Sequence, residues 1–167
     1  HEEAPGRGAH RYHGAAAGIR RMAFASSDTA LGFTFSEHKP EPRYLPVDED
    51  HPVLPDDSYG LSKVLAERAC DALSQRFEGL SIASLRITGI VTPDRYETGS
   101  KWFENLVTPS HSNNLWSYLD VRDAAKAFRL AVETDLAGHE VFFVGAETTR
   151  SLVPTAELIS TYYPGVP

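Results

Sequence analysis

Cysteine is almost absent from this sequence, which has only Cys70 among 167 residues. One cysteine can form neither an intrachain disulfide nor a multi-cysteine zinc site, and it favours a reducing, cytoplasmic compartment. Basic residues are also scarce, with 16 Lys and Arg against 23 Asp and Glu and a formal net charge of -7. Nucleic acid is therefore not an expected partner, because binding it needs a basic face that neutralises phosphates.

Long apolar runs are missing as well. No stretch approaches the roughly 20 residues that span a bilayer, and the first residues lack the basic-then-apolar order of a signal peptide. We therefore expect no membrane partner. No metal site is predicted either, because His10 and His13 lie in a lead-in rich in Gly and Ala. Apolar residues still make up 41% of the chain, which is enough for a packed core.

Helix-like and strand-like segments alternate along the chain. Residues 1–18 predict a loose lead-in with a short helix around 12–17. Residues 33–57 hold five prolines and predict a long loop, because proline continues neither a helix nor a central strand. The other expected elements are strands at 20–27, 80–87, 115–119 and 140–144, and helices over 58–78, 101–106, 121–133 and 151–162. Such alternation is typical of a parallel sheet, so we expect an α/β fold.

Tyr59 and Lys63 stand four residues apart at the start of the clearest helix, which places them on one face. The apolar stripe expected on the opposite side comprises Leu61, Val64, Leu65, Ala69, Ala72, Leu73 and Phe77. We therefore expect the pair to face a surface or cleft. An ammonium stabilises a nearby phenolate, so such a pair can act as a general base. A surface tyrosine packed on a lysine stem fits the same spacing.

Ser26 and Ser27 end the strand predicted at 20–27. Ligands of parallel α/β sheets bind at the carboxyl ends of the strands. A hydroxyl at this position, ahead of a helix that bears Tyr59 and Lys63, gives three polar groups that can converge. Ordinary turn chemistry at a strand end is the alternative reading.

Four motifs resemble, in order, those of the extended short-chain dehydrogenases/reductases, the NAD-dependent sugar epimerases and dehydratases. Residues 24–32 (FASSDTALG) resemble the S-S-x-x-x-Y-G stretch of the family. Residues 46–67 are similar to its P-x-x-E…P…Y-x-x-S-K-x-x-x-E stretch. Residues 84–90 (SLRITGI) and 118–125 (YLDVRDAA) are similar to its L-R-x-x-x-V/I strand and to its Y-V-x-V-x-D-x-A helix start.

The resemblance implies an enzyme that uses NAD or NADP on a hydroxyl of a sugar or nucleotide sugar. Tyr59 would exchange a proton with the substrate, Lys63 would stabilise the phenolate and hold the nicotinamide ribose, and Ser27 would hydrogen-bond the reacting oxygen. The further residues implied at the cofactor are Ser26, Thr88, Gly89 and Ile90, and at the substrate Asp28, Thr29, Arg95 and Arg122. A homodimer is the implied assembly.

The fold implied is the C-terminal portion of a doubly wound, Rossmann-type parallel sheet with part of a small substrate-binding lobe. Residues 19–92 would form the Rossmann-type portion, and 93–167 would mix substrate-lobe elements with returning Rossmann elements. The family's glycine-rich dinucleotide motif is absent, and Gly89 stands where sugar-nucleotide epimerases often carry asparagine. We therefore expect this chain alone to be inactive. A plain dehydrogenase of a sugar or small hydroxy compound and a non-catalytic binding module remain alternatives.

Overall fold

The computed structural model describes residues 7–96 and 112–167. Its helices and strands follow one another in the alternating order that the sequence predicts. They are α1 (Arg7–Ala16), β1 (Arg21–Ser27), η1 (Asp28–Leu31), α2 (Ser58–Arg76), β2 (Ser81–Ile87), β3 (Ile90–Val91), η2 (Pro93–Tyr96), β4 (Leu119–Asp120), α4 (Val121–Glu133), β5 (His139–Val144) and α5 (Thr155–Tyr162). The helix expected at 101–106 lies outside the described residues. None of the helices described is long and apolar enough to cross a membrane.

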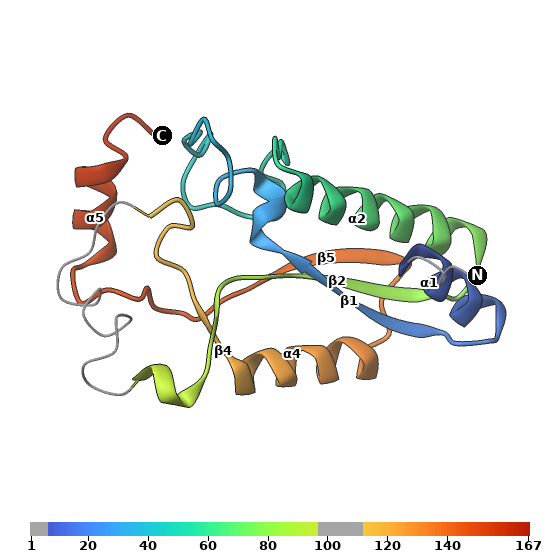
Figure 1. Ribbon diagram of the computed structural model, residues 1–167. Coiled ribbons are helices and arrows are strands. Elements are labelled where there is room, and N and C mark those ends of the chain that lie inside the picture. The colour runs from blue at the N-terminus through green and yellow to red at the C-terminus, as the bar shows by residue number, and fades with distance from the viewer. Residues whose placement is uncertain (1–6, 97–111) are drawn as a thin grey trace, which may run out of the picture.

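A parallel sheet with the strand order β1-β2-β5 forms the centre of the molecule. Arg21 lies opposite Ser81 at one end of the β1–β2 pairing and Ser27 opposite Ile87 at the other. Helices α2 and α4 cover opposite faces of this sheet, and α5 lies beyond the carboxyl ends of its strands (Figure 1). The expected α/β class is thereby confirmed.

Three expected elements differ from the structure. The short helix expected around 12–17 is longer and begins earlier, as α1 over Arg7–Ala16. The strand expected at 115–119 is reduced to β4, because Leu115 and Trp116 turn with positive φ angles of 55° each. The last helix begins at Thr155 and not at Ser151. The Ser151 hydroxyl instead accepts a hydrogen bond from the Val153 amide at 3.1 Å, which closes a local turn before the helix.

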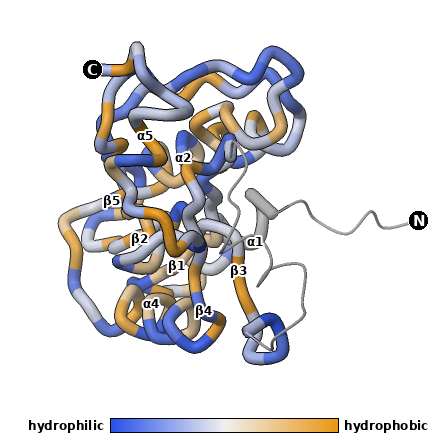
Figure 2. The backbone as a smooth tube through the Cα atoms, turned by 90° about the vertical axis from the view of Figure 1, so that its left-hand side faces the viewer, coloured by the Kyte–Doolittle hydropathy of each residue, from blue (hydrophilic) through white to orange (hydrophobic). Residues whose placement is uncertain are grey.

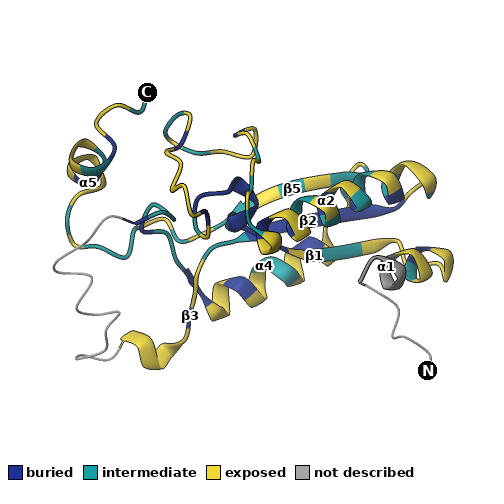
Figure 3. Ribbon diagram, turned by 45° about the horizontal axis from the view of Figure 1, so that its top comes forward, coloured by how far each residue is buried: buried dark blue, intermediate teal, exposed yellow. Residues whose placement is uncertain are grey.

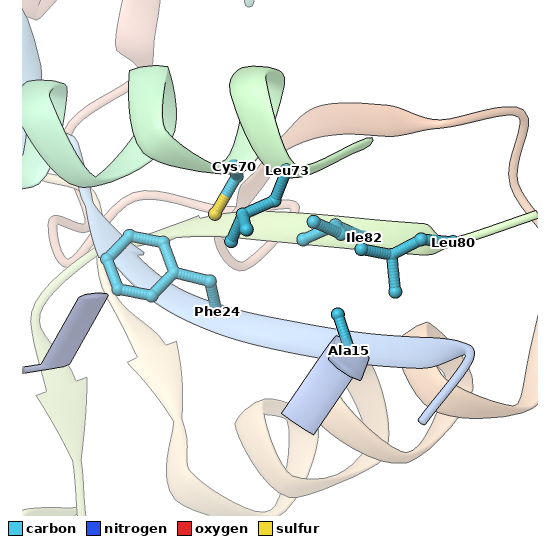
Figure 4. Packing of buried hydrophobic residues seen from close by; sticks show 6 residues of the cluster. All are labelled: Ala15, Phe24, Cys70, Leu73, Leu80 and Ile82. Carbon is cyan, nitrogen blue, oxygen red and sulfur yellow. The ribbon is translucent and has the colours of Figure 1, made fainter. Parts of the chain in front are cut away.

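The apolar core on one side of the sheet lies under α2. Figure 4 shows Cys70 and Leu73 of α2 directed toward Ile82 of β2 and Phe24 of β1. Cys70 is fully buried there. Burial of such side chains is the main favourable term in folding.

A second apolar cluster lies beyond the carboxyl ends of the strands. Trp116, Leu158 and Tyr163 are each 2% exposed and form its centre. The Tyr163 hydroxyl donates a hydrogen bond of 2.8 Å to the Ser112 carbonyl, which ties α5 to the segment before β4. Figure 2 shows the molecule from the side of this cluster. Helix α5 lies close to the C-terminus, and strands β1, β2 and β5 lie between α2 and α4.

The apolar stripe expected on α2 was wrong for the first half of the helix, although Leu73 and Phe77 of the same stripe pack in the core. Leu61 and Leu65 are 48% and 61% exposed on the outer side of the helix, which Figure 3 colours largely as exposed. The buried face instead comprises Gly60, Lys63, Glu67, Cys70 and Leu73. Polar interactions with the sheet therefore set the orientation of the first half of this helix.

A buried ion pair joins α2 to β2. Two nitrogens of Arg86, Nε and Nη2, donate to the two carboxylate oxygens of Glu67 at 3.1 and 2.8 Å. The side chains are only 5% and 7% exposed. Ser26 at the end of β1 donates to the same carboxylate, and Arg86 Nη1 donates to the Glu49 carbonyl at 3.3 Å. One carboxylate thus connects α2 with β1, β2 and the long loop.

Glu67→Ala should lower the free energy of unfolding by about 3–5 kcal/mol, because it leaves the buried Arg86 charge unpaired. Urea denaturation measures the change. Arg68→Ala serves as the matched control on the exposed side of the same helix, where the Arg68–Asp71 pair should contribute about 0–1 kcal/mol. Equal effects of the two variants would contradict the role given to Glu67. The double variant Glu67→Leu/Arg86→Met should recover most of the loss, since no charge is then left unpaired.

Candidate active site

Ser27 and Tyr59 line one pocket of about 360 Å³ at the carboxyl ends of β1 and β2. Asp28 and Thr29, which follow Ser27, also line this pocket, as does Thr88, which follows β2. Parallel α/β sheets bind their ligands at this edge. The structure therefore brings together two of the three predicted catalytic side chains, and with them four further predicted site residues: Asp28, Thr29, Thr88 and Gly89.

Ser27 is held by the turn that ends β1. Its hydroxyl accepts a hydrogen bond of 3.3 Å from the Thr29 amide and thereby caps η1. The same hydroxyl donates to the Asp28 carboxylate at 3.1 Å. Gly32 ends η1 with a φ of 88°, a left-handed conformation that glycine adopts without strain. The hydroxyl is therefore fixed at the pocket wall.

The N-terminus of α2 brings Tyr59 to the same pocket. Asp57 caps the helix by accepting a hydrogen bond of 2.8 Å from the Gly60 amide. A side chain at position 60 would lie 2.6 Å from the Thr29 carbonyl. Only glycine lets the helix approach η1 this closely, and this approach sets Tyr59 opposite Ser27.

Lys63 lies on the buried side of α2, contrary to the expectation that it faces away from the core with Tyr59. Its ammonium donates a hydrogen bond of 2.8 Å to the Ala25 carbonyl of β1. The same Nζ lies 5.1 Å from the centroid of the Tyr59 ring. Tyr59 itself is 47% exposed, and its ring meets the edge of Phe35. A positive charge therefore stands behind the phenol, on the protein side of the pocket.

Four other predicted site residues do not line this pocket. Ser26 is 1% exposed and bonds to Glu67 inside the fold, so its hydroxyl is directed away from the pocket. Ile90 pairs with Leu119 in the small β3–β4 sheet. Arg95 is exposed on η2.

Arg122 lines a separate hollow beside Tyr118 and Tyr96. Its guanidinium donates twice to Asp120, at 2.8 and 2.7 Å. These hydrogen bonds hold the pKa of the Asp120 carboxyl well below its ordinary value and raise that of Arg122. The cation of Arg122 is thus already paired, at a distance from the pocket of Ser27 and Tyr59.

Two buried hydroxyl oxygens at the pocket lack hydrogen-bond partners among the described residues. They belong to Thr29 and Thr88, both of which line the pocket. Buried polar groups are almost always hydrogen-bonded in folded proteins. Both oxygens are themselves buried, so they lie behind the pocket surface.

A larger apolar pocket of about 460 Å³ adjoins this one. The two pockets share the wall formed by Asp28, Thr34, Thr88 and Asn114. The sequence signalled only that the loop 33–57 is unusually long, which is common for functional loops. The lining residues from that loop and from α5 could not be assigned to a site without the structure.

Comparisons with known proteins find one matching family and several similar proteins. The model of the NAD dependent epimerase/dehydratase family matches residues 12–145. The UDP-glucose 4-epimerase of Corynebacterium glutamicum is 26% identical over 169 residues, covering 84% of this chain and 47% of that protein. The chain spans about half the length of this relative.

Two solved structures share the fold. The glucuronic acid dehydrogenase of Chromohalobacter salexigens superposes with a TM-score of 0.60 at 22% identity, over 96% of this chain and 51% of that one. A short-chain dehydrogenase/reductase superfamily protein from Agrobacterium tumefaciens, with bound NAD, gives a TM-score of 0.61 at 24% identity, over 88% and 53% of the two chains.

Burial raises the pKa of the Asp28 carboxyl above its ordinary value of 3.8, although the hydrogen bond from Ser27 opposes the shift. Ionisation of Asp28 is thus less favourable in the folded state than in the unfolded state, so the free energy of unfolding declines as pH rises from the unfolded-state pKa through the folded-state pKa. Asp28→Asn should therefore raise the thermal unfolding midpoint at pH 7. At a pH below 3.8 the gain should vanish, because Asp28 is then protonated in both states. Calorimetric melts at both pH values test this, and an equal gain at both would contradict it.

Proposed function

The chain belongs to the NAD-dependent epimerase/dehydratase family, and we propose that it carries the proton-transfer site of an NAD(P)-dependent oxidoreductase acting on a hydroxyl of a sugar or nucleotide sugar. One observation carries the proposal: Ser27 and Tyr59 line the same pocket, with the Lys63 ammonium 5.1 Å from the Tyr59 ring. The names of the relatives support the substrate class, since one is a UDP-glucose 4-epimerase and another a glucuronic acid dehydrogenase.

Each of the three side chains has a role that fits its position. Tyr59 takes the proton of the substrate hydroxyl, or returns it, at its phenol oxygen. Ser27 turns its one hydroxyl proton from Asp28 to the same substrate oxygen and so holds that oxygen at the pocket wall. An ammonium has three donors, so the bond from Lys63 to Ala25 leaves two for other partners. The charge of Lys63 stabilises the phenolate that proton transfer creates.

NAD or NADP would supply the hydride acceptor, since no side chain can play that part. The residues present fit its nicotinamide end. Lys63 has donors for the ribose, and the backbone of Gly89 and Ile90 follows β2. A side chain at position 89 would meet nothing within 4 Å, so the space beside this backbone is open.

A plain dehydrogenase of a sugar or small hydroxy compound is the second candidate. One observation favours it: of the described residues that line the two adjoining pockets, none is Lys or Arg. A diphosphate is usually held by such side chains. Arg122 pairs with Asp120 outside both pockets, so it is not placed to hold a diphosphate either.

The apolar cluster of Trp116, Leu158 and Tyr163 supports a substrate-binding lobe within residues 93–167, with its own small core. The Rossmann-type portion would then be residues 19–92. A homodimer stays a prediction, which sedimentation of the full-length protein would test.

Tyr59→Phe keeps the ring and removes the proton-carrying oxygen, so turnover by the full-length protein should fall by about 10²–10⁴-fold. The formation of reduced nicotinamide measures turnover, with UDP-glucose and glucuronic acid as trial substrates. Tyr44→Phe is the matched control, because this tyrosine bonds to Asp48 on the exposed loop. Unchanged turnover in Tyr59→Phe would remove Tyr59 from the mechanism.

The 167-residue chain alone should bind only the nicotinamide end of the cofactor, because it lacks the glycine-rich motif that holds the pyrophosphate. NAD and nicotinamide mononucleotide should then bind it with similar, weak affinity. In the full-length protein NAD should bind at least about a hundredfold more tightly, since two charge-assisted hydrogen bonds supply that much. Calorimetric titration measures these affinities. Micromolar NAD binding by the chain alone would overturn the expectation.

A further inference from the structure

The loop 33–57 encloses a histidine that the proton transfer described above does not use. His51 is only 3% exposed, although it lies in a loop. Its ring meets the ring of Phe33 edge-on, with the centroids 5.3 Å apart, and packs on the Tyr44 ring at 4.9 Å. A histidine buried this deeply needs partners for both ring nitrogens, because a buried polar group without a hydrogen bond costs free energy.

Both ring nitrogens of His51 bond to the backbone of the same loop. Nε2 lies 2.9 Å from the Arg43 amide nitrogen, and Nδ1 lies 3.0 Å from the Pro52 carbonyl oxygen. An amide N–H can only donate a hydrogen bond, and a carbonyl oxygen can only accept one. The single proton of the neutral ring is therefore on Nδ1, and Nε2 presents its lone pair to the Arg43 amide.

This bonding is lost when the ring is protonated. A charged imidazolium carries a proton on each nitrogen, so Nε2 would meet the Arg43 amide as donor against donor. The ring must then leave its place, so that both donors find other acceptors. Histidine is the side chain whose charge ordinarily changes between about pH 5 and 8. The bond between Arg43 and His51 thus forms only with the neutral ring.

The titratable groups around His51 stabilise a charged ring that has left this place. Residues 48–50 (Asp-Glu-Asp) directly precede it in the loop, and carboxylates stabilise a nearby cation. Tyr44 stays neutral, because its hydrogen bond to the first of these acids raises its pKa to about 12. The Arg43 side chain is exposed, and Arg86, which bonds to a carbonyl of the acidic stretch, is already paired inside the fold. Acid therefore shifts the loop toward the state in which the Arg43 amide is released.

The bond between Arg43 and His51 closes the part of the loop that forms one wall of the larger pocket. Residues 45–47 line that pocket and lie between the two bonded residues. Beyond them, Glu49 fastens the loop to the sheet, because its carboxylate accepts a hydrogen bond of 2.7 Å from the Phe143 amide of β5. The His51 ring therefore joins the chain before the pocket wall to a stretch that is already anchored.

We propose that His51 is a positioning residue, whose neutral ring holds residues 45–47 in place as a pocket wall, and that acidification releases this wall. The effect on turnover rests on the proposed function, whereas the closure is a property of the loop itself. A second bond, from the Leu45 amide to the Pro167 main-chain oxygen at 2.8 Å, does not involve the ring. Release of His51 therefore loosens the wall without unfolding the loop.

The protonation of the His51 ring tests the closed state directly. Imidazole ¹H–¹⁵N NMR spectra of the full-length protein at about pH 8, the neutral end of the ordinary histidine range, should show His51 protonated at Nδ1 alone. Hydrogen exchange, corrected for its intrinsic pH dependence, should show the Arg43 amide losing at least about tenfold of its protection at about pH 5. A ring protonated at Nε2 at the higher pH, or equal protection at both, would overturn the inference.

Two histidine variants in the same loop separate the ring of His51 from general effects of pH. His51→Gln supplies an amide oxygen that accepts from the Arg43 amide and takes up no proton, so the protection of Arg43 should no longer depend on pH. His38→Gln is the matched control, because the His38 side chain is 85% exposed and bonds to Asp56, and it should keep the wild-type response. A response that survives in His51→Gln, or is lost in His38→Gln, would contradict the role of His51.

Turnover separates this inference from the proposed function. With UDP-glucose or glucuronic acid, the KM of the wild type relative to His51→Gln should rise about fivefold between the two pH values, since only the closed loop completes the pocket, and the ratio of their kcat values should stay constant. A constant KM ratio would remove His51 from the pocket wall.

The two proposals can fail independently. If the Arg43 amide responds to pH as expected but Tyr59→Phe leaves turnover intact, the role of His51 stands and that of Tyr59 falls. If Tyr59→Phe abolishes turnover while the His51 ring is protonated at Nε2 at the higher pH, the oxidoreductase function stands and the inference about His51 falls.

Discussion

The carboxylate of Glu67 connects the helix and strands that carry the candidate active site. It lies four residues after Lys63 on α2, pairs with Arg86 of β2, and accepts a hydrogen bond from Ser26 of β1. Because all three partners lie in the interior, the ion pair is desolvated, and its loss would leave a charge that the surroundings cannot hydrate. The hydrogen bond from Arg86 to the Glu49 carbonyl extends the same connection to the loop 33–57.

The positions of the candidate catalytic groups follow from this connection. Ser26 is fixed to α2, so Ser27, the next residue, presents its hydroxyl at the end of β1. Lys63 lies one turn before Glu67 and reaches the Ala25 carbonyl on the same strand. Tyr59 lies one further turn toward the N-terminus, where Gly60 allows the helix to approach η1. Tyr59, Lys63 and Glu67 are four residues apart, so they follow one another along one side of α2. Each makes its own contact with the neighbouring elements.

The sequence predicted much of this arrangement and misjudged one part of it. Alternating segments predicted the α/β class, and the serine at a strand end predicted the place of Ser27. The spacing of Leu61 and Leu65 suggested a buried stripe, but the buried face of α2 is set by ionic and polar contacts with Arg86 and Ala25, which helical periodicity does not reveal. The apolar pocket depends on contacts between segments that are distant in sequence, so it could not be predicted from local pattern.

The central claim is that Ser27, Tyr59 and Lys63 form one reaction centre at which the nicotinamide lies. A crystal structure of the full-length protein with NAD bound tests it most directly. The account predicts the nicotinamide ring in the pocket lined by Ser27, Tyr59 and Thr88, with the Lys63 ammonium donating to its ribose. A nicotinamide bound away from this pocket, with the Lys63 ammonium bonded only to Ala25, would contradict the account.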